Sequence, residues 1–382
     1  MTQERQRISG DMIRRGGSTS KDAEQAVEEL AAKLGATDLN SMLFFCAPTY
    51  DLDALGRAIR HHFECPVIGC TTAGEILAPA GYMQHSLVGV GFATPEISFT
   101  PMFIPSLTDF VNAPDASLLL SPLPNSPGRQ FCLLLIDGLS MLEERVVAAI
   151  HHVLRRVPLI GGSAGDGLNF KKAFVYHEGR FYGNAATMAI FSTSLPFKIF
   201  QFQHFTPTKT KLVITEADIA HRNVSEINGL PAAEEYARIV GVAVDELSPS
   251  VFAAHPVMLR IGGEYYVRSI QKANADGSLT FYCAIENGLV LTLATSEHLL
   301  EQLSSQLADL SRDLPDLQLI LGCDCILRRL ELEQCDYFAR IADILAQYPF
   351  IGFSTYGEQY GGIHVNQTLT GLAIGAGYDS ER

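Results

Sequence analysis

Apolar and polar positions along the chain form a pattern that occurs three times. Each copy has a continuous apolar run, then apolar residues spaced three and four apart, then a short apolar run ending at glycine, and one further apolar run. A continuous apolar run predicts a buried strand, and the three-and-four spacing predicts an amphipathic helix. The repeating unit is therefore predicted to be strand, helix, strand, glycine turn and strand.

The glycine turns carry the clearest similarity between the units. Segments 66–75, 158–166 and 349–358 share a proline, two apolar residues, a glycine, a hydroxyl residue, then a glycine and a carboxylate. Such a unit buries its apolar face only against neighbouring units, so the three should share a core. The second gap is about twice the first, and Pro256–Glu264 is our candidate for a weak fourth copy.

The expected elements take their bounds from this pattern. The opening strands are predicted at 42–46, 131–136 and 317–323, the helices at 53–63, 143–156 and 335–348, and the closing strands at 86–92, 185–191 and 367–374. A further helix should run from Lys21 until Gly35 stops it, and another from Pro231 to Val240. Asp276-Gly277 between alternating apolar residues predicts a hairpin.

These elements predict an α/β fold in which repeated β-α-β-β units form mixed sheets flanked by helices. With 382 residues, the chain is longer than one core usually organises, so we expect two domains around a central cleft. The predicted divisions are a flexible lead-in at 1–20, a first domain at 21–194 and a second at 195–382.

Composition narrows the class of partner. The chain is 47% apolar and carries a net charge of −14, which disfavours nucleic acid and anionic membrane surfaces. No apolar run reaches the roughly 18 residues of a spanning helix, and the first residues are polar, so we expect a cytoplasmic protein without membrane insertion. The eight cysteines are too sparse for a disulfide scaffold and should be reduced thiols.

The glycine turns are the leading candidates for a ligand site. A glycine and a hydroxyl residue after a buried strand leave backbone N–H groups free at a strand end, where α/β folds usually bind ligands. The alternative is that these residues only make tight turns and cap the next element. The predicted ligand-binding residues are Thr71, Thr72, Glu75, Ser163, Asp166, Arg268, Cys323, Tyr356, Glu358 and Asn366.

Metal and catalytic motifs are sparse. His204, His255 and His364 lie near apolar or glycine-rich segments and are candidate haem ligands, among which spacing does not choose. Cys323-Asp324-Cys325 lacks the second pair that a zinc site needs, although a thiol-dependent enzyme is kept as a third hypothesis. Segment 161–165 matches Gly-x-Ser-x-Gly, but turn residues follow it where a nucleophile elbow needs a helix.

Two groups of motifs resemble a known family. Segments 66–76 and 158–166 are similar to the FIST N-terminal domain. Arg268-Ser269-Ile270 and segments 322–329, 352–359 and 364–371 are similar to the FIST C-terminal domain. The resemblance extends from about Leu43 to Gly375.

This resemblance implies an intracellular sensory protein that binds a small ligand and signals through a partner. Members similar to the NosP type imply haem b, nitric oxide as ligand and a sensor histidine kinase as partner, in biofilm or cyclic-di-GMP control. The alternative is a haem-free receptor for a polar metabolite such as an amino acid, with paired Glu and Arg groups suited to its amine and carboxylate. Neither reading identifies the native ligand or partner, and a homodimer is an open possibility.

Overall fold

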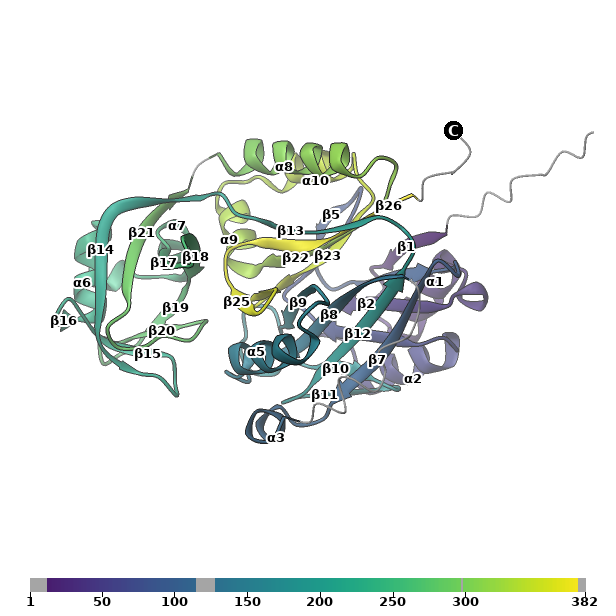
Figure 1. The fold of residues 1–382 in the computed structure, drawn as a ribbon, viewed down its shortest axis with the longest axis horizontal. Helices are drawn as coiled ribbons and strands as arrows, with labels where there is room; N and C mark the ends of the chain where they lie inside the picture. Colours follow the sequence, from purple (N-terminus) through teal and green to yellow (C-terminus); the bar gives the residue numbers. More distant parts are fainter. Residues whose placement is uncertain (1–11, 115–127, 297, 377–382) are drawn as a thin grey trace, which may run out of the picture.

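Three six-stranded sheets form the core of the protein, and a separate strand-rich lobe extends from it (Figure 1). The computed structural model describes residues 12–114, 128–296 and 298–376. Each core sheet is built around one of the three sequence units. In every one the two inner strands are parallel and all other neighbours are antiparallel, which confirms the predicted mixed α/β architecture.

The three sheets have the same strand arrangement. In order across each sheet, the first contains β1 (Ile13–Ser18), β6 (Leu87–Phe92), β2 (Ser41–Cys46), β3 (Val67–Thr71), β10 (Val175–His177) and β11 (Arg180–Tyr182). The second contains β7 (Ile97–Ile104), β12 (Ala186–Thr193), β8 (Arg129–Asp137), β9 (Leu159–Ala164), β24 (Glu358–Tyr360) and β25 (Ile363–Val365). The third contains β13 (Phe197–Phe202), β26 (Leu369–Gly375), β22 (Leu317–Cys325), β23 (Phe350–Thr355), β4 (Glu75–Leu77) and β5 (Gly81–Met83).

Each sheet is completed by a hairpin from another unit. The β4-β5 hairpin of the first unit pairs with β23 of the third. The β10-β11 hairpin of the second unit pairs with β3 of the first, and the β24-β25 hairpin of the third pairs with β9 of the second. The chain leaves its own sheet at each glycine turn to reach the next sheet. The three turns must therefore cross one another near the centre of the core.

Helices cover the outer face of each sheet. These are α1 (Ala23–Leu34) and α2 (Leu52–His62) on the first, α3 (Leu107–Asn112) and α5 (Glu143–Leu154) on the second, and α8 (Leu299–Asp313), α9 (Ile326–Gln334) and α10 (Phe338–Leu345) on the third; η1 (Ala36–Asp38) follows α1. The α1 helix ends at Gly35 as predicted, because that residue adopts φ 65° and its N–H bonds Ala31 O. The inner faces of all three sheets share one apolar core.

The strand β2 shows why the sequence has continuous apolar runs. Leu43 and Phe45 face the shared core, whereas Met42 and Phe44 face the layer of α1 and α2. Since successive side chains point to opposite faces of a strand, burial of both faces requires every position to be apolar. The same reasoning applies to β8, in which Leu133 faces the shared core.

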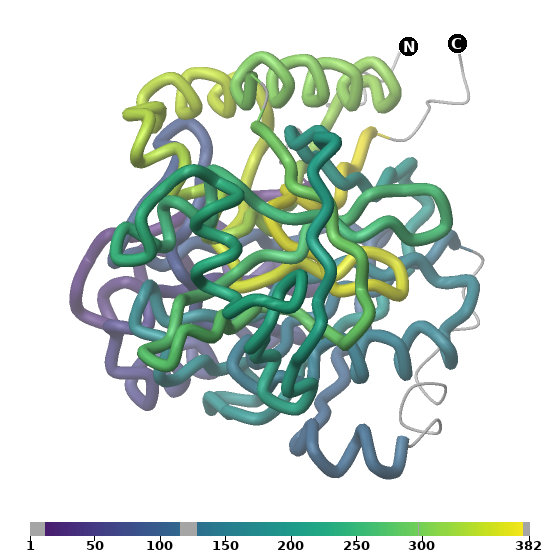
Figure 2. Tube along the Cα trace, turned by 90° about the vertical axis from the view of Figure 1, so that its left-hand side faces the viewer, coloured from purple at the N-terminus to yellow at the C-terminus, as the bar shows by residue number. Residues whose placement is uncertain are grey.

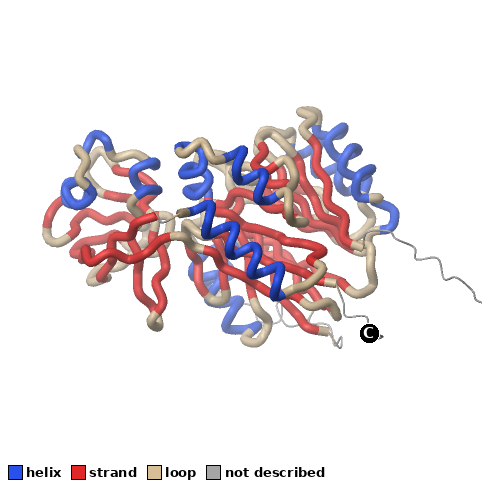
Figure 3. The backbone as a smooth tube through the Cα atoms, turned by 90° about the horizontal axis from the view of Figure 1, so that it is seen from above, coloured by secondary structure: helices blue, strands red, loops and turns tan. Residues whose placement is uncertain are grey.

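An insertion between β13 and α8, residues 205–296, forms the separate lobe. Its elements are β14 (Phe205–Asp218), β15 (Asn223–Ile227), β16 (Leu230–Pro231), α6 (Ala232–Val240), η2 (Val244–Glu246), α7 (Pro249–Ala254), β17 (Val257–Ile261), β18 (Glu264–Arg268), β19 (Ile270–Ala273), β20 (Leu279–Phe281) and β21 (Val290–Ser296). It has its own apolar core. Figure 2, viewed from that side, shows the insertion in front of the core, and Figure 3 shows its strands at one end of the molecule.

The insertion overturns the predicted fourth repeat. Pro256 precedes β17, which pairs antiparallel with β18 and β21, and the Gly262-Gly263 turn after it closes the β17-β18 hairpin instead of leading into another sheet. The long gap between the second and third glycine turns is therefore due to an inserted lobe. The hairpin around Asp276-Gly277 is confirmed, with β19 and β20 as its strands. The predicted division at residue 195 stays a prediction; in space, β13 and the third unit share the core of the first two.

One further prediction was wrong, and one helix was not predicted. The lead-in was expected to be unstructured, but Ile13–Ser18 forms β1, which pairs with β6 along its whole length; residues 1–11 lie outside the described part of the chain. The helix expected at 335–348 is present as α10, but α9, which precedes that range, was not predicted. The helical pattern of α9 was missed in the sequence because many of its residues are polar. Within the described ranges, none of the helices combines the length and hydropathy that crossing a bilayer requires.

A glycine in the third sheet provides a test of this packing. A Cβ on Gly352 would stand 2.2 Å from the carbonyl oxygen of Gly322 on the neighbouring strand, whereas a Cβ on Gly183 would meet nothing closer than 3.7 Å. Gly352→Ala should lower the free energy of unfolding by about 1–3 kcal/mol, since the clash is with backbone. Urea unfolding measures this, and Gly183→Ala is the matched control. Equal stability of the two variants would contradict the close packing of β23 against β22 at Gly352.

Candidate ligand-binding site

The three glycine turns meet at the centre of the core and hydrogen-bond one another. The bonds run from Ala73 N to Ser354 O (2.9 Å), from Ser354 N to Gly74 O (2.7 Å), from Gly165 N to Thr71 O (3.0 Å) and from Ser163 N to Gly357 O (2.9 Å). Asp166 N also bonds the hydroxyl of Tyr356, at 3.1 Å. The predicted convergence of the turns is therefore present in the structure.

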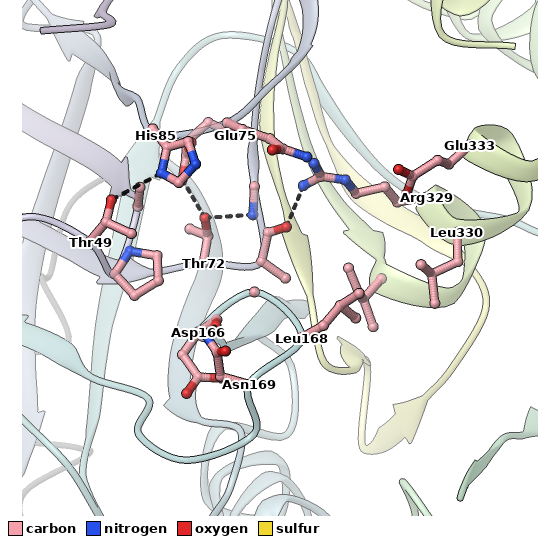
Figure 4. A pocket seen from close by; sticks show the side chains of 17 residues that line it. Thr49, Thr72, Glu75, His85, Asp166, Leu168, Asn169, Arg329, Leu330 and Glu333 are labelled. Atoms are coloured by element: carbon pink, nitrogen blue, oxygen red, sulfur yellow. Dashed lines mark hydrogen bonds between the residues drawn. The ribbon is translucent and has the colours of Figure 1, made fainter. Parts of the chain in front are cut away.

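A pocket of about 280 Å³ opens beside this crossing, and we call it the corner pocket. Its walls are the first and second glycine turns, the residues after β2, the loop between β5 and β6, and one face of α9 (Figure 4). The polar side chains lining it belong to Thr49, Thr72, Glu75, Gln84, His85, Asp166, Asn169, Arg329 and Glu333. Three of these, Thr72, Glu75 and Asp166, were predicted as ligand-binding residues.

Glu75 is a fully buried carboxyl group on the pocket wall. Its Oε1 accepts a hydrogen bond from Thr72 Oγ1 at 2.5 Å, and its Oε2 accepts one from Ser86 Oγ at 2.6 Å. Burial raises the pKa of Glu75 to about 7, while the bonds from Ser86 and Thr72 and the charge of Arg329 act in the opposite direction. Oε2 also accepts from Ser86 N at 3.3 Å, so Oε1 is the oxygen that retains a second lone-pair site for a ligand.

Arg329 brings a guanidinium from α9 against the first glycine turn. Its Nη1 donates to the carbonyl oxygen of Ala73. Gly74 is needed at this point because its φ is 133°, and because a Cβ there would stand 1.5 Å from Arg329 Nη1. Figure 4 shows the Arg329 side chain reaching from α9 toward Glu75. The pocket therefore presents an acid and a fixed positive charge side by side.

Asp166 shapes the pocket through its loop. Its carboxylate accepts hydrogen bonds from the backbone N–H groups of Phe170 (2.8 Å), Lys171 (2.9 Å) and Lys172 (2.9 Å) and from the Tyr356 hydroxyl. With its acceptor sites occupied in this way, Asp166 is suited to hold the loop that presents Leu168 and Asn169 to the pocket. The second unit thus differs from the others: its carboxylate folds a longer loop before the hairpin begins.

The remaining predicted residues lie behind or beyond the pocket wall. Thr71 accepts a bond from Phe174 N (3.0 Å), and Ser163 accepts one from Gln359 Nε2 (2.9 Å), so both fix the crossing. Tyr356 does not line the pocket, but its hydroxyl bonds two residues that do, Asp166 and Gly167. The other four are buried around the third turn and do not line the pocket: Arg268, Cys323, Glu358 and Asn366.

Burial around the third turn leaves several polar atoms without a hydrogen bond. These include Arg268 Nε, Glu358 Oε1, His364 Nε2 and both amide atoms of Asn366. Glu358 Oε2 accepts from Thr368 Oγ1 at 2.7 Å, as Glu75 accepts from Ser86 in the first unit. Burial raises the pKa of Glu358 well above its usual range. The two units therefore share a carboxyl-to-hydroxyl bond that ties the start of each hairpin to the following strand.

The three candidate haem ligands differ in how their ring nitrogens are engaged. Both ring nitrogens of His204 are occupied, Nε2 by Glu331 (2.8 Å) and Nδ1 by Arg328 (2.7 Å). His364 is buried among polar groups, and its Nδ1 lies 3.3 Å from Gln359 Nε2. None of the three histidines lines the corner pocket. Within the described ranges, no three His, Cys, Asp or Glu residues are grouped as metal ligands.

The thiols of the third unit lack the features of a nucleophile. Cys323 and Cys325 are both buried, and burial raises the pKa of each well above its usual range. A reactive cysteine needs a depressed pKa and access to solvent. Cys323 instead belongs to the shared apolar core.

Several pocket residues were missed from the sequence: Thr49, Gln84, His85, Asn169, Arg329 and Glu333. Most lie on loops and have no pattern of their own. Arg329 and Glu333 had a detectable signal, since they are four residues apart with Ile326 and Leu330 at the matching helical positions. Had 326–334 been recognised as a helix, both residues would have shared a predicted face.

Comparison with known proteins agrees with the resemblance found in the sequence. The family model described as the FIST N domain matches residues 40–230, and the one described as the FIST C domain matches residues 232–361. A search of curated proteins found no match.

The burial of Glu75 predicts a dependence of stability on pH. Because its pKa in the folded protein is about 7, above its usual value, the native state binds more protons than the unfolded chain between about pH 4.5 and 7. Stability from this group is present below that window and is lost as the pH rises through it. As the pH rises from 5 to 8, the free energy of unfolding of wild type should therefore fall relative to that of Glu75→Gln, by up to about 3 kcal/mol.

Urea unfolding of both proteins at the two pH values measures this difference. The control is Glu333→Gln, which replaces an exposed carboxylate on the same pocket and should keep the wild-type slope. A Glu75→Gln variant with the wild-type pH slope would show that Glu75 titrates as an ordinary carboxyl group.

Proposed function

We propose, from the premise that the chain belongs to the FIST family of sensory domains, that it senses a small polar molecule bound in the corner pocket. The observation that carries the proposal is that Glu75 and Arg329 both lie on the wall of a pocket enclosed by two glycine turns and α9, with the charge of Arg329 acting on the Glu75 carboxyl group. Binding at a place where the three units cross would affect all three sheets.

The charges favour a ligand that carries both an amine and a carboxylate. A guanidinium binds carboxylates through paired, charge-assisted hydrogen bonds, and a carboxylate accepts bonds from an ammonium group. An amine beside Glu75 would also favour the ionised carboxylate, so that Glu75 would lose its proton near neutral pH. A free amino acid meets these requirements. The volume, at the lower end of the roughly 300–1,000 Å³ of typical ligand sites, suits a molecule of that size.

Haem b, nitric oxide and a sensor histidine kinase stay predictions. Both ring nitrogens of His204 are hydrogen-bonded, which does not favour ligation, whereas Nε2 of the buried His364 has no hydrogen bond. His255 is partly buried, and burial lowers its pKa, which leaves the neutral ring that iron requires. The absorbance spectrum of purified protein after incubation with haem tests this reading, because a Soret band that responds to nitric oxide would restore it. A kinase or other partner would read the ligand-bound state by contact.

A ligand screen tests the amino-acid proposal. A thermal-shift series with the common amino acids should identify at least one that stabilises the protein, by about 2.7 kcal/mol at a hundred times its Kd. Arg329→Met should weaken binding of that amino acid by ten- to a hundredfold, because a charge-assisted hydrogen bond contributes about 1.5–3 kcal/mol. Arg340→Met, on the neighbouring α10 and outside the pocket, is the matched control.

Derivatives of the ligand separate binding from a general loss of structure. The amide of the amino acid lacks the carboxylate, so Arg329→Met should bind the amide and the free acid about equally. Wild type should prefer the acid. Stabilisation of wild type by none of the amino acids, or an unchanged preference in Arg329→Met, would exclude this ligand class.

A further inference from the structure

The insertion is joined to the core by two chain segments that are held by one side chain. His204 lies where the chain enters the insertion, and Ser296 lies at the end of β21, where the chain leaves it. Glu331 on α9 accepts a bond from His204 Nε2 at 2.8 Å through Oε2, and one from Ser296 Oγ at 2.7 Å through Oε1. We call 203–207 and 291–296 the entry and exit stems. One carboxylate therefore fixes both stems.

The bond to the entry stem is aligned by a buried network. Arg328 Nη1 donates to His204 Nδ1 at 2.7 Å, so the ring proton is on Nε2 and points to Glu331. Arg328 Nε also donates to Asp324 Oδ1 at 2.7 Å, and Asp324 Oδ2 accepts from the Tyr82 hydroxyl at 2.6 Å. Since Tyr82 is on the β5 hairpin of the first unit, the network ties the entry stem to two units of the core.

The same helix forms a wall of the corner pocket. Ile326, Arg329, Leu330 and Glu333 face the pocket, whereas Arg328 and Glu331 contact the entry stem and its network. Helical spacing places these two sets on different faces of α9. A shift of a helix moves both faces together. Displacement of α9 by a molecule in the pocket would therefore change the geometry of the Glu331 bonds.

A second contact leads from the pocket to the insertion. Phe170, on the loop organised by Asp166, packs against Tyr282 of the insertion with ring centroids 6.0 Å apart, and against Tyr356 at 4.8 Å. Leu168 and Asn169 of the same loop line the pocket. This loop and α9 are thus two walls of the pocket that also contact the insertion, which α5 and the third turn hold as well through contacts of Arg222 with Glu143 and Glu144 and of Arg268 with His364.

We propose that α9 couples occupancy of the corner pocket to the attachment of the insertion, by loosening the Glu331 bonds to both stems when the pocket is filled. This inference rests on the proposed function for its biological meaning, because it describes how a bound ligand would be reported. The insertion is then the moving part that a partner reads. Reciprocity requires that weakening the Glu331 bonds also changes the affinity of the pocket.

A covalent occupant tests the coupling without a native ligand. Leu168 is 54% exposed and lines the pocket, so Leu168→Cys can be modified with N-ethylmaleimide. The exposed Cys335 is replaced by Ser in every variant. Hydrogen–deuterium exchange of the two stems, followed by mass spectrometry, should quicken at least about fivefold on modification, the lower end of typical allosteric coupling. His61→Cys, exposed on α2, carries the same adduct as the control and should leave the stems unchanged.

Two further variants complete the test. Arg329→Met removes the bond to Ala73 and should quicken stem exchange without any adduct. In Glu331→Gln, hydrogen–deuterium exchange of both stems should already be fast without an adduct. Modification of Leu168→Cys in that background should therefore increase the exchange rate of the stems little further. Stems that do not respond to either the adduct or Arg329→Met would overturn the coupling. That result would leave the amino-acid proposal standing, whereas a failed ligand screen with responsive stems would leave the coupling standing.

Discussion

The exchange of hairpins between the three units is the constraint on which the rest of the structure depends. No unit completes its own sheet: β4-β5, β10-β11 and β24-β25 each pair with a strand of another unit. Unpaired strand edges inside a protein are costly, so the three units must fold onto one another for any one sheet to be complete. The glycine turns cross at the centre because they are the links between sheets.

The pocket arises where the threefold pattern is broken. In the first and third units, a glutamate follows the turn directly, starts the hairpin and is tied to a hydroxyl group on the next strand. In the second unit, Asp166 bonds three successive backbone N–H groups and so holds a loop before β10 begins. That loop stands away from the crossing, and the space between it and α9 is the corner pocket. A small departure from the repeat thus produces a polar pocket to which all three units contribute.

The sequence predicted those features that depend on local pattern. Continuous apolar runs located β2, β8 and β22 because these strands are buried on both faces, and proline-glycine spacing located the turns. The exchange of hairpins could not be predicted, since sequence periodicity does not say with which strand a hairpin pairs. Segment 256–264 of the insertion was mistaken for a weak fourth repeat because Pro256-Val257 resembles the start of a turn segment. Strand β1 was missed since Arg14, Gly16 and Gly17 dilute its apolar pattern.

The candidate site shows the same limit. Thr72, Glu75 and Asp166 were found because they belong to the repeated turns. Arg329 was not among the predicted residues, because its role depends on α9 lying against the first turn. Arg268, Glu358 and Asn366 were predicted to bind the ligand, but they are buried around the third turn and do not line the corner pocket. Polar residues that crowd together in a sequence identify a region more readily than they identify which side of it a ligand would reach.

The central claim is that a small zwitterion binds between Glu75 and Arg329. A crystal structure of the protein grown with the amino acid that stabilises it most would test this claim most directly. The account predicts electron density in the corner pocket, with the ligand carboxylate on Arg329 and its amine toward Glu75. Density for the ligand at the buried cluster around His364 and Asn366, with the corner pocket holding only solvent, would contradict it.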